Sequence, residues 1–398
     1  MENPKIRFKG FTKDWEQRKL GDMGSTFTGL SGKTKEDFGH GDAQFITYMN
    51  VFSNPVANLE MTEAVEIDAK QNRVKKGDVF FTTSSETPEE VGMSCVMPEN
   101  KDNIYLNSFC FGYRPTEKFD LDYLAYVLRA DSFRKEMKFL AQGISRYNIS
   151  KNKVMEVSIP IPNLEEQTMV GRYFSTLDHL ITLHQRKCEQ TKNLKKYMLQ
   201  KMFPQNGAKV PEIRFNGFTH DWEQRKLGEL GTVQTCKRIF KDQTSEKGDI
   251  PFFKNGTIGL EPDSYISREM YEEFRRLYPY PEVGDTLISV VGSIGRTAEY
   301  TGKDEYFQDS NVVWLKTDGS INKKFLKISY QVIKWLIEGS TVKHLYNDNI
   351  LRSEIIMPVS QIEQAKIAEF FEELDHLITL HQRQTDFYKK PNFYFISS

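Results

Sequence analysis

Residues 4–24 read PKIRFKGFTKDWEQRKLGDMG and residues 211–231 read PEIRFNGFTHDWEQRKLGELG, so 16 of 21 positions are identical. A second block, DHLITLHQR, occupies residues 178–186 and returns unchanged at residues 375–383. Between these blocks the two halves of the chain share only short fragments. Because a period of about 200 residues far exceeds that of solenoids and propellers, the chain is a duplicated frame that carries two different inserts.

Each half of the frame is expected to contain a long helix. Asn163 and Ser360 stand at the same place in the repeat, and each is followed three residues later by a glutamate, which is typical of a helix start. Apolar residues then recur at spacings of three and four, which predicts a first helix over about residues 165–203. The second helix is expected to be shorter, because its sequence departs from the repeat after Arg383 and Pro391 breaks it.

The apolar stripes of these two helices need a packing partner. The stripes include Val170, Phe174 and Leu177 in the first helix, and Ile367, Phe371 and Leu374 in the second. Packed against each other in antiparallel fashion, the helices would form a spacer that separates the two inserts. The alternative is that each stripe docks on its own domain, but a helix of about 40 residues is long for a domain of this size.

The inserts are expected to form α+β domains rich in short strands. Residues 76–82 and 283–289 each predict a turn and a strand, and residues 122–140 and 323–337 have helical spacing. The expected fold class is α+β, with two mixed, strand-rich domains separated by two long antiparallel helices in a pseudo-twofold duplication. The expected boundaries are 1–162 for the first domain, 163–205 for the central helix, 206–359 for the second domain, and 360–398 for the C-terminal helix with a divergent tail.

Composition limits the classes of function. The chain has 398 residues, with 54 Lys plus Arg against 55 Asp plus Glu and a formal net charge of -1, so a polyanion would have to bind a local patch. The N-terminus lacks a signal-peptide core and no long apolar run occurs, so we expect a cytoplasmic protein without a membrane partner. The scattered cysteines fit reduced thiols.

The sequence contains no catalytic constellation. The Gly-Lys-Thr of residues 32–34 resembles the end of a phosphate-binding loop, but Phe27 stands where that loop needs its first glycine. His179 and His184 are five residues apart, a spacing that does not place two rings on one helical face, so a metal pair is not expected. Two dissimilar domains without catalytic motifs on one duplicated frame indicate a protein that recognises something.

Several motifs together resemble a known family. They are the RF-x-GF-x-x-x-WEQRKLG blocks at residues 7–21 and 214–228, the passage from GISRYNIS to IPIPNLEEQ at residues 143–167, and the duplicated LDHLITLHQR helices. The combination looks like the specificity subunit of type I restriction-modification systems, and the resemblance covers the whole chain.

The resemblance implies a non-catalytic subunit that recognises DNA. Two target-recognition domains would each read one part of a bipartite, interrupted sequence in double-stranded DNA. The implied protein partners are two modification (methyltransferase) subunits and the restriction subunits, which translocate and cleave DNA. The resemblance places S-adenosylmethionine, ATP and Mg²⁺ in those partners and no cofactor or metal in this chain. Methylation of adenine N6 would require a base to be flipped into a partner's pocket.

Base readout needs loops that carry Arg, Lys, Asn, Gln or hydroxyl groups. In the first domain the residues expected to bind DNA are Ser145, Arg146, Tyr147 and Asn148, flanked by Thr82, Thr83, Ser84 and Ser85. In the second domain they are Lys343, His344, Asn347, Lys254, Asn255, Ser293, Arg296 and Gln308. Arg146, which lies in a passage that resembles a DNA-contacting segment of the family, is the leading candidate.

A second set of residues is expected to bind the protein partners, because these residues belong to the duplicated frame. They are Trp15, Arg18, Trp222, Arg225, Phe174, Leu177, Asp178, Phe371, Leu374 and Asp375. The two tryptophans are expected to pack against the helices and the modification subunits. A basic run on the first helix could follow phosphates across the unread part of the DNA, and a solvated helix face explains that run equally well.

Two other classes of function remain open at this point. A divergent DNA-modifying enzyme predicts turnover by the isolated chain with a metal or S-adenosylmethionine, and the missing motifs argue against it. A coiled-coil scaffold that binds only protein predicts association without sequence preference, and it leaves the dissimilar inserts unexplained.

Overall fold

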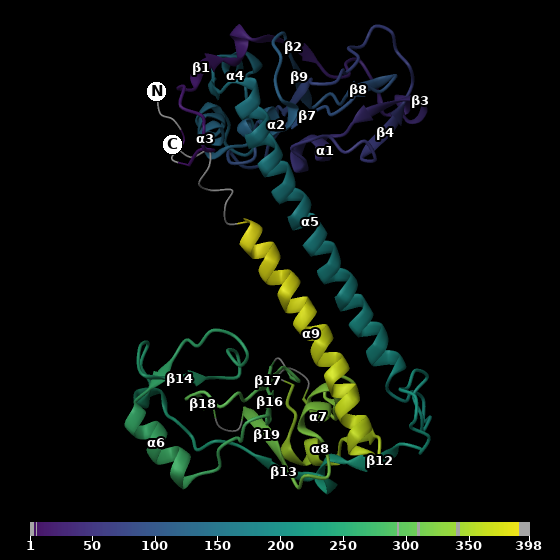
Figure 1. Cartoon of the computed structure of the whole chain (residues 1–398), viewed down its shortest axis with the longest axis vertical. Coiled ribbons are helices and arrows are strands. Elements are labelled where there is room, and N and C mark those ends of the chain that lie inside the picture. Colours follow the sequence, from purple (N-terminus) through teal and green to yellow (C-terminus); the bar gives the residue numbers. More distant parts are fainter. Residues whose placement is uncertain (1–3, 5, 293, 309–310, 340–342, 390–398) are drawn as a thin grey trace. The chain divides into compact units, whose positions relative to one another are not determined.

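The computed structural model of the chain describes residue 4 and residues 6–292, 294–308, 311–339 and 343–389. The chain divides into two compact units, Met1–Gln185 with Gln382–Ser398, and Arg186–His381. Each unit contains one insert together with part of each long helix (Figure 1). Each insert therefore lies wholly within one unit.

In the first unit, two sheets form the centre of the insert. A four-stranded antiparallel sheet has the order β2-β9-β5-β7, and a three-stranded sheet has the order β4-β3-β8, in which β3 and β8 are parallel. Phe80 and Phe81 of β5 enter different buried clusters, so this strand is covered on both faces. The elements are β1 (Glu16–Lys19), β2 (Gly24–Thr28), β3 (Phe38–Ile46), α1 (Tyr48–Ser53), β4 (Thr62–Val65), β5 (Val79–Thr82), β6 (Ser84–Ser85), β7 (Ser94–Val96), β8 (Ile104–Leu106), β9 (Cys110–Pro115), α2 (Leu121–Val127), α3 (Asp131–Leu140), β10 (Tyr147–Asn148), α4 (Lys151–Met155) and β11 (Ser158–Ile161).

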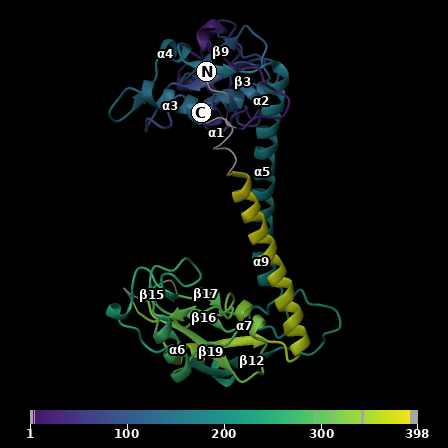
Figure 2. The same ribbon diagram turned by 60° about the vertical axis from the view of Figure 1, so that its left-hand side comes forward.

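The second unit repeats this sheet plan with a different sequence, and Figure 2 shows its strands β15, β16, β17 and β19. A four-stranded sheet has the order β13-β19-β16-β17, and a three-stranded sheet has the order β15-β14-β18, in which β14 and β18 are parallel. Leu287 and Ile288 of β16 enter different buried clusters, as the two phenylalanines of β5 do. The elements are β12 (Glu223–Lys226), β13 (Gly231–Gln234), β14 (Ile250–Phe253), β15 (Tyr265–Ile266), α6 (Arg268–Leu277), β16 (Thr286–Ser289), β17 (Thr297–Glu299), β18 (Tyr306–Phe307), β19 (Val312–Thr317), α7 (Lys323–Ser329), α8 (Asn347–Arg352) and β20 (Glu354–Met357).

Two long helices complete the frame, α5 (Leu164–Lys201) and α9 (Gln361–Lys389). Both predicted start signals are confirmed. The Asn163 and Ser360 side chains each accept a hydrogen bond from the backbone N–H of the residue three positions later, at 2.9 and 3.4 Å. α5 ends two residues before the predicted Phe203. The Phe203 ring leaves the helix because it packs among aromatic side chains of the second unit, at 5.9 Å from the ring of Trp222.

A buried ion pair joins the start of each helix to the segment that precedes β1 or β12. Arg7 Nε donates to Glu166 Oε1 at 2.6 Å in the first unit, and Arg214 Nε donates to Glu363 Oε1 at 2.7 Å in the second. Both glutamates are almost fully buried. In each pair the arginine Nη2 donates to the second oxygen of the glutamate. The same Nη2 also donates to a backbone carbonyl six residues further along the chain, that of Lys13 or His220. The glutamate at the third helical position therefore binds a distant arginine.

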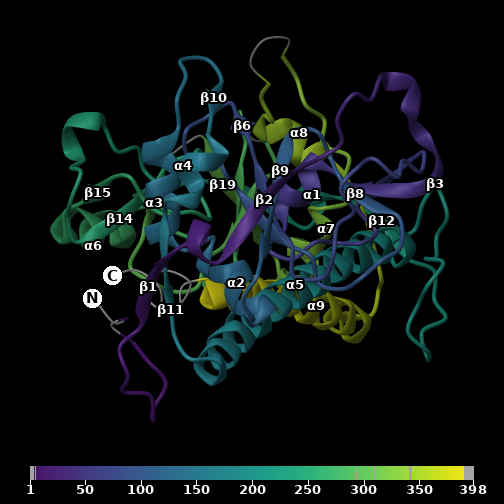
Figure 3. The ribbon, with the colours of Figure 1, turned by 90° about the horizontal axis from the view of Figure 1, so that it is seen from above.

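The glutamine that follows each of these glutamates makes a second duplicated link. Gln167 Nε2 donates to the Pro162 carbonyl, and its Oε1 accepts from the backbone N–H of Asp120, the N-cap residue of α2. Gln364 bonds in the same way to the carbonyl of Pro358 and to the N–H of Asn322, the N-cap residue of α7. Figure 3 shows α2 beside the start of α5. The frame thus holds one helix of each insert in a fixed place.

Contacts inside each unit establish that α5 and α9 run antiparallel, as predicted. In the second unit, Cys188 lies against Ile378, and Lys195 Nζ is 2.7 Å from Asp375 Oδ1. In the first unit, the ring of His184 stacks on Tyr388, with ring centroids 5.7 Å apart. Residue numbers that rise along α5 meet numbers that fall along α9, and this order defines an antiparallel pair.

Two helix predictions were wrong in extent. Residues 122–140 form two helices, because the half-buried Arg129 between them donates to four carbonyls, those of Ser94, Val51, Phe52 and Asn54, instead of pointing to solvent. Residues 323–337 are helical only as far as Ser329. The chain turns there so that Trp335 packs on the buried Tyr330, with ring centroids 5.5 Å apart.

The buried ion pair generates a stability prediction. In the Arg7→Ala variant the Glu166 carboxylate stays buried without its cation, which we expect to lower the free energy of unfolding by about 3 kcal/mol. Urea unfolding of the full chain measures this loss. The control is Arg18→Ala, which removes the exposed partner of Glu117 and is expected to leave the unfolding curve nearly unchanged. Equal effects of the two substitutions would contradict the role assigned to the buried pair.

Candidate nucleic-acid interface

Both inserts bring polar side chains to the carboxyl ends of two parallel strands. In the first insert, β3 and β8 end at Ile46 and Leu106, and the next residues are Thr47 and Asn107. In the second insert, β14 and β18 end at Phe253 and Phe307, and the next residues are Lys254 and Gln308. Neighbouring parallel strands end at one edge of a sheet, so each insert gathers its loops at an equivalent edge.

The first insert joins the two predicted DNA-binding segments. β6 pairs with β10, so that Ser84 lies opposite Asn148 and Ser85 lies opposite Tyr147. The Arg146 guanidinium donates to Ser84 Oγ from Nη2 at 3.1 Å and from Nε at 3.3 Å. Ser145 and Arg146 are exposed. The expected adjacency of residues 82–85 and 145–148 is therefore confirmed.

The hydroxyl groups of this first site are not equally available. Thr82 is fully buried, and its Oγ1 accepts a hydrogen bond from the Met93 N–H. Thr83 Oγ1 donates to the Phe109 carbonyl at 2.7 Å. These two threonines hold the loop in place, and Ser84 positions Arg146. Of the predicted residues in this insert, Ser85 and the segment that contains Arg146 can therefore contact a ligand directly.

A pocket of about 510 Å³ lies at this edge of the first insert. Besides Ser84, Ser85, Ser145 and Arg146, it is lined by side chains that the sequence analysis missed, including Tyr48, Met49, Phe52, Glu90 and Phe109. Tyr48 Oη donates to the Ser84 carbonyl at 2.8 Å, and the Tyr48 and Phe52 rings stack. The only signal in the sequence was the position of Tyr48 two residues after a strand, because an aromatic residue in an apolar segment otherwise predicts core.

The second insert brings three of its predicted residues together, namely Asn255, Gln308 and Arg296. The backbone N–H of Asn255 donates to Gln308 Oε1 at 3.0 Å, and its Nδ2 donates to the Val291 carbonyl at 2.5 Å. Its Oδ1 accepts a hydrogen bond from the buried Ser289 hydroxyl. Arg296 Nη1 donates to the carbonyl of the adjacent Gly256 at 3.0 Å. Both ends of the Asn255 amide are therefore used inside the chain, which makes Asn255 a positioning residue.

The remaining predicted residues of the second insert lie beside this cluster. His344 bridges Val291 in the same way that β10 meets β6, and its ring stacks on Tyr346. Lys343 and Asn347 are exposed in the same segment. Lys254 Nζ is 3.0 Å from Asp263 Oδ1. Ser293 lies outside the described residues. Among the described residues of this site, Lys343 and Asn347 are exposed donors, and Gln308 is half-buried.

Most side chains expected to bind protein partners face the interior of this chain. The apolar members of the set are all less than 8% exposed, namely Trp15, Trp222, Phe174, Leu177, Phe371 and Leu374. The Trp222 indole N–H donates to Glu363, the acid of the buried ion pair. Burial leaves almost none of the surface of these side chains for another protein, so they stabilise the frame from inside. This corrects the expectation that they contact the modification subunits directly.

The charged members of that set are bound within the chain as well. Arg18 forms a two-point ion pair with Glu117, and Arg225 pairs with Glu229. Asp178 accepts a hydrogen bond from Tyr126 Oη at 2.9 Å. Asp375, its counterpart in the repeat, instead pairs with Lys195. Identical frame residues thus meet different neighbours in the two units.

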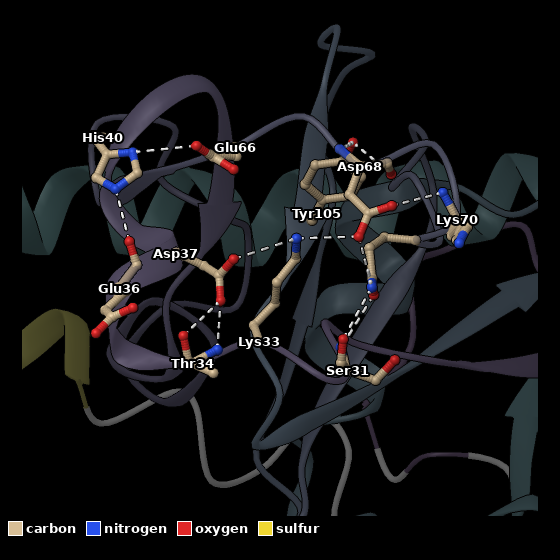
Figure 4. A network of polar contacts seen from close by, with 11 residues as sticks. Ser31, Lys33, Thr34, Glu36, Asp37, His40, Glu66, Asp68, Lys70 and Tyr105 are labelled. Carbon is tan, nitrogen blue, oxygen red and sulfur yellow. Dashed lines mark hydrogen bonds and ion pairs between the residues drawn. The ribbon is translucent and has the colours of Figure 1, made fainter.

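The Gly-Lys-Thr of residues 32–34 is surrounded by acids (Figure 4). Lys33 Nζ lies 3.1 Å from Asp68 Oδ2 and 3.9 Å from Asp37 Oδ1. The Thr34 backbone N–H and hydroxyl both donate to the Asp37 carboxylate. A phosphate group placed here would meet two carboxylates, so this segment does not have the electrostatics of a nucleotide site.

Within the described parts of the chain, no group of three or more His, Cys, Asp or Glu side chains could hold a metal ion. None of the helices formed by those residues combines the length and the apolar character that crossing a membrane requires.

Comparisons with known proteins agree with one another. The family model for the type I restriction modification DNA specificity domain matches residues 12–193 and 219–386. A putative type I restriction enzyme specificity subunit of Haemophilus influenzae is 38% identical over 270 residues, which cover 66% of this chain and 67% of that protein. The putative MjaX specificity subunit of Methanocaldococcus jannaschii is 25% identical over 405 residues, covering 94% of this chain and 90% of that protein. In fold, the chain is similar to the crystal structure of a type I restriction-modification S subunit from M. genitalium, with a TM-score of 0.64, 14% identity and coverage of 99% and 98%.

The role of Asn255 in positioning the loop predicts that its substitution lowers the stability of the chain. Asn255→Ala removes the acceptor of the buried Ser289 hydroxyl and the Nδ2 donor to the Val291 carbonyl, and leaves these two groups only the 3.3 Å hydrogen bond between them. We therefore expect a loss of about 1 to 3 kcal/mol in the free energy of unfolding. Thermal and urea unfolding measure this loss. The matched variant Lys254→Ala removes a side chain on the outside of the same turn and is expected to unfold like the unchanged chain. A stable Asn255→Ala chain would contradict the positioning role.

The repeated aspartates give a second comparison. Burial raises the pKa of Asp178, so the folded chain holds this proton more tightly than the unfolded chain does. The ionised carboxylate therefore costs stability, and the cost develops as the pH rises from the ordinary aspartate pKa to the raised one and is constant above it. At pH 7 we expect Asp178→Asn to be as stable as the unchanged chain or more stable.

The matched variant is Asp375→Asn, which removes the ion pair with Lys195 and is expected to be less stable than the unchanged chain at pH 7. Urea unfolding of both variants at several pH values measures the difference. A greater loss of stability in Asp178→Asn than in Asp375→Asn at pH 7 would show that this assignment is wrong.

Proposed function

Because this chain belongs to the family of type I restriction-modification DNA specificity subunits, we propose that it reads a double-stranded DNA sequence in two parts, one with each insert. In this proposal the frame brings two modification subunits, and with them the restriction subunits, to that sequence. The chain itself recognises DNA and carries out no chemical step.

The observation that carries the proposal is the equivalent placement of two dissimilar sites. Each site lies at the end of a parallel strand pair and next to a bridge between two loops, β6 with β10 in the first insert and Val291 with His344 in the second. The first site carries Arg146 among hydroxyl and aromatic groups, and the second carries Lys343, Asn347 and Gln308. Such donors read base edges, and different donors read different bases.

The duplicated frame supports two copies of one protein partner. The Arg–Glu pair, the glutamine links and the β1–β11 and β12–β20 ribbons recur in both units with the same register, in which Gln17 and Gln224 occupy the same place. Identical surfaces bind identical partners. The exposed polar side chains of these ribbons are available to a partner, whereas Trp15 and Trp222 stabilise the ribbons from inside.

The proposed division of labour assigns the cofactors to the partners. S-adenosylmethionine would serve the modification subunits, and ATP with Mg²⁺ would serve the restriction subunits. The net charge of -1 on this chain is consistent with that division, since the isolated chain then binds phosphates weakly and the partners supply much of the cationic surface.

A methylation map tests the proposal. The chain is co-expressed with a modification subunit that binds it, in a host that lacks other DNA methylation, and every methylated adenine is located by sequencing. We expect one motif made of two specified halves with an unread gap of constant length. Replacing residues 25–157 with the corresponding insert of another family member is expected to change one half of the motif only.

The same experiment can reject the proposal. Methylation at a short uninterrupted motif would contradict reading by two separate inserts. A soluble complex whose motif changes in both halves after exchange of residues 25–157 would contradict the assignment of one half to each insert. Turnover by the isolated chain would favour a divergent enzyme.

A further inference from the structure

A glutamate lines the pocket of the first insert in a fixed position. Glu90 Oε2 accepts hydrogen bonds from Thr87 Oγ1 at 2.9 Å and from Ser85 Oγ at 3.1 Å. No hydrogen bond from the described residues reaches its Oε1. Two hydroxyl groups therefore hold the carboxylate from one side, and its second oxygen is left to accept a donor from outside the chain.

Arg146 lines the same pocket and is also held from one side. Its Nε and Nη2 both donate to Ser84 Oγ, so one edge of the planar guanidinium is occupied. The edge formed by Nη1 and the outer hydrogen of Nη2 remains, and this edge is a two-point donor. Arg146 and Glu90 do not form an ion pair, although their charges are opposite and they line one pocket of about 510 Å³.

A carboxylate in a DNA-binding pocket needs a specific explanation. It repels the phosphate backbone and so weakens non-specific binding. It strengthens binding only where a hydrogen-bond donor of the ligand faces it. In the major groove a G·C pair presents the N7 and O6 acceptors of guanine beside the N4 amino group of cytosine. Arginine is the common partner of the guanine edge, and a carboxylate accepts from cytosine N4.

We propose that Arg146 and Glu90 together read one G·C base pair in the half-site of the first insert, with Arg146 on guanine and Glu90 on cytosine. This inference rests on the proposed function and names the base pair that this site selects. The neighbouring aromatic side chains support it. Tyr48 and Phe52 stack in the wall of the pocket, and exposed Phe109 and Met49 also line it, which lowers the local polarity and strengthens polar contacts to a base.

The variant Glu90→Gln tests the inference in the full complex of the chain with its modification subunit. The complex that contains the unchanged chain is expected to methylate sites that have an invariant G·C pair in the half assigned to the first insert. In Glu90→Gln, methylation at sites with another pair at that position is expected to rise by about 5- to 150-fold relative to cognate sites. The second half and the gap are expected to stay the same.

The matched control is Glu86→Gln. Glu86 is exposed, lines the same pocket and carries the same charge, but no hydroxyl group of the described chain holds its carboxylate. We expect the complex with this variant to methylate the same motif as the complex with the unchanged chain, and with the same discrimination. A relaxed motif in Glu86→Gln as well would reduce the effect to lost charge and overturn the inference.

A second measurement needs no variant and so does not depend on folding. The unchanged complex is titrated with cognate duplexes in which guanine is replaced by 7-deazaguanine or cytosine by N4-methylcytosine at the pair in question. Each change removes one group that Arg146 or Glu90 would bind, and we expect binding to weaken by about 5-fold or more.

The outcomes separate the inference from the function on which it rests. A bipartite motif whose first half lacks an invariant G·C pair, or a Glu90→Gln chain with unchanged discrimination, would overturn the inference and leave the proposed function intact. The absence of any bipartite motif with the unchanged chain would overturn the proposed function itself.

Discussion

The frame depends on a buried arginine–glutamate pair that occurs twice. Arg7 reaches Glu166 at 2.6 Å and Arg214 reaches Glu363 at 2.7 Å, and each arginine also fixes the loop that leads into the first strand of its ribbon. An isolated buried carboxylate is costly, so the arginine segment must stay on the helix start whenever the chain is folded. This one constraint sets where the ribbon, the helix and the insert begin.

A constant frame with variable inserts separates the residues that keep the fold stable from the residues that decide what is recognised. In one and the same set of residues, these two requirements would compete. The frame residues are fixed by packing, as the buried Trp222 beside Glu363 shows, and a change there disturbs the fold. The reading residues stand on loops at strand ends, where Arg146 is held by a single serine hydroxyl. Substitutions at such positions alter what is recognised without altering the scaffold, because loop side chains contribute little to the core.

The sequence predicted the frame well because the repeat itself carries structural information. The caps at Asn163 and Ser360, the antiparallel helices and the adjacency of residues 82–85 with 145–148 all follow from residues that recur or stand in a recognisable motif. The break at Arg129 and the pocket residues Tyr48 and Glu90 were missed, since long-range contacts decide them. Duplication marks both packing and binding, so the sequence predicts that the frame tryptophans pack on the helices and also contact the partners, whereas in the structure they are buried within the frame.

The most direct test of the account is to interchange the two inserts, residues 25–157 and residues 232–353, within one chain and to map adenine methylation in the presence of the modification subunit. If each insert carries its own half of the target and the two frames are equivalent, the interchanged chain directs methylation to the same two half-sequences as the unchanged chain. A folded, partner-bound chain that loses either half-sequence, or that reads a new one, would contradict the separation of a constant frame from independent readers.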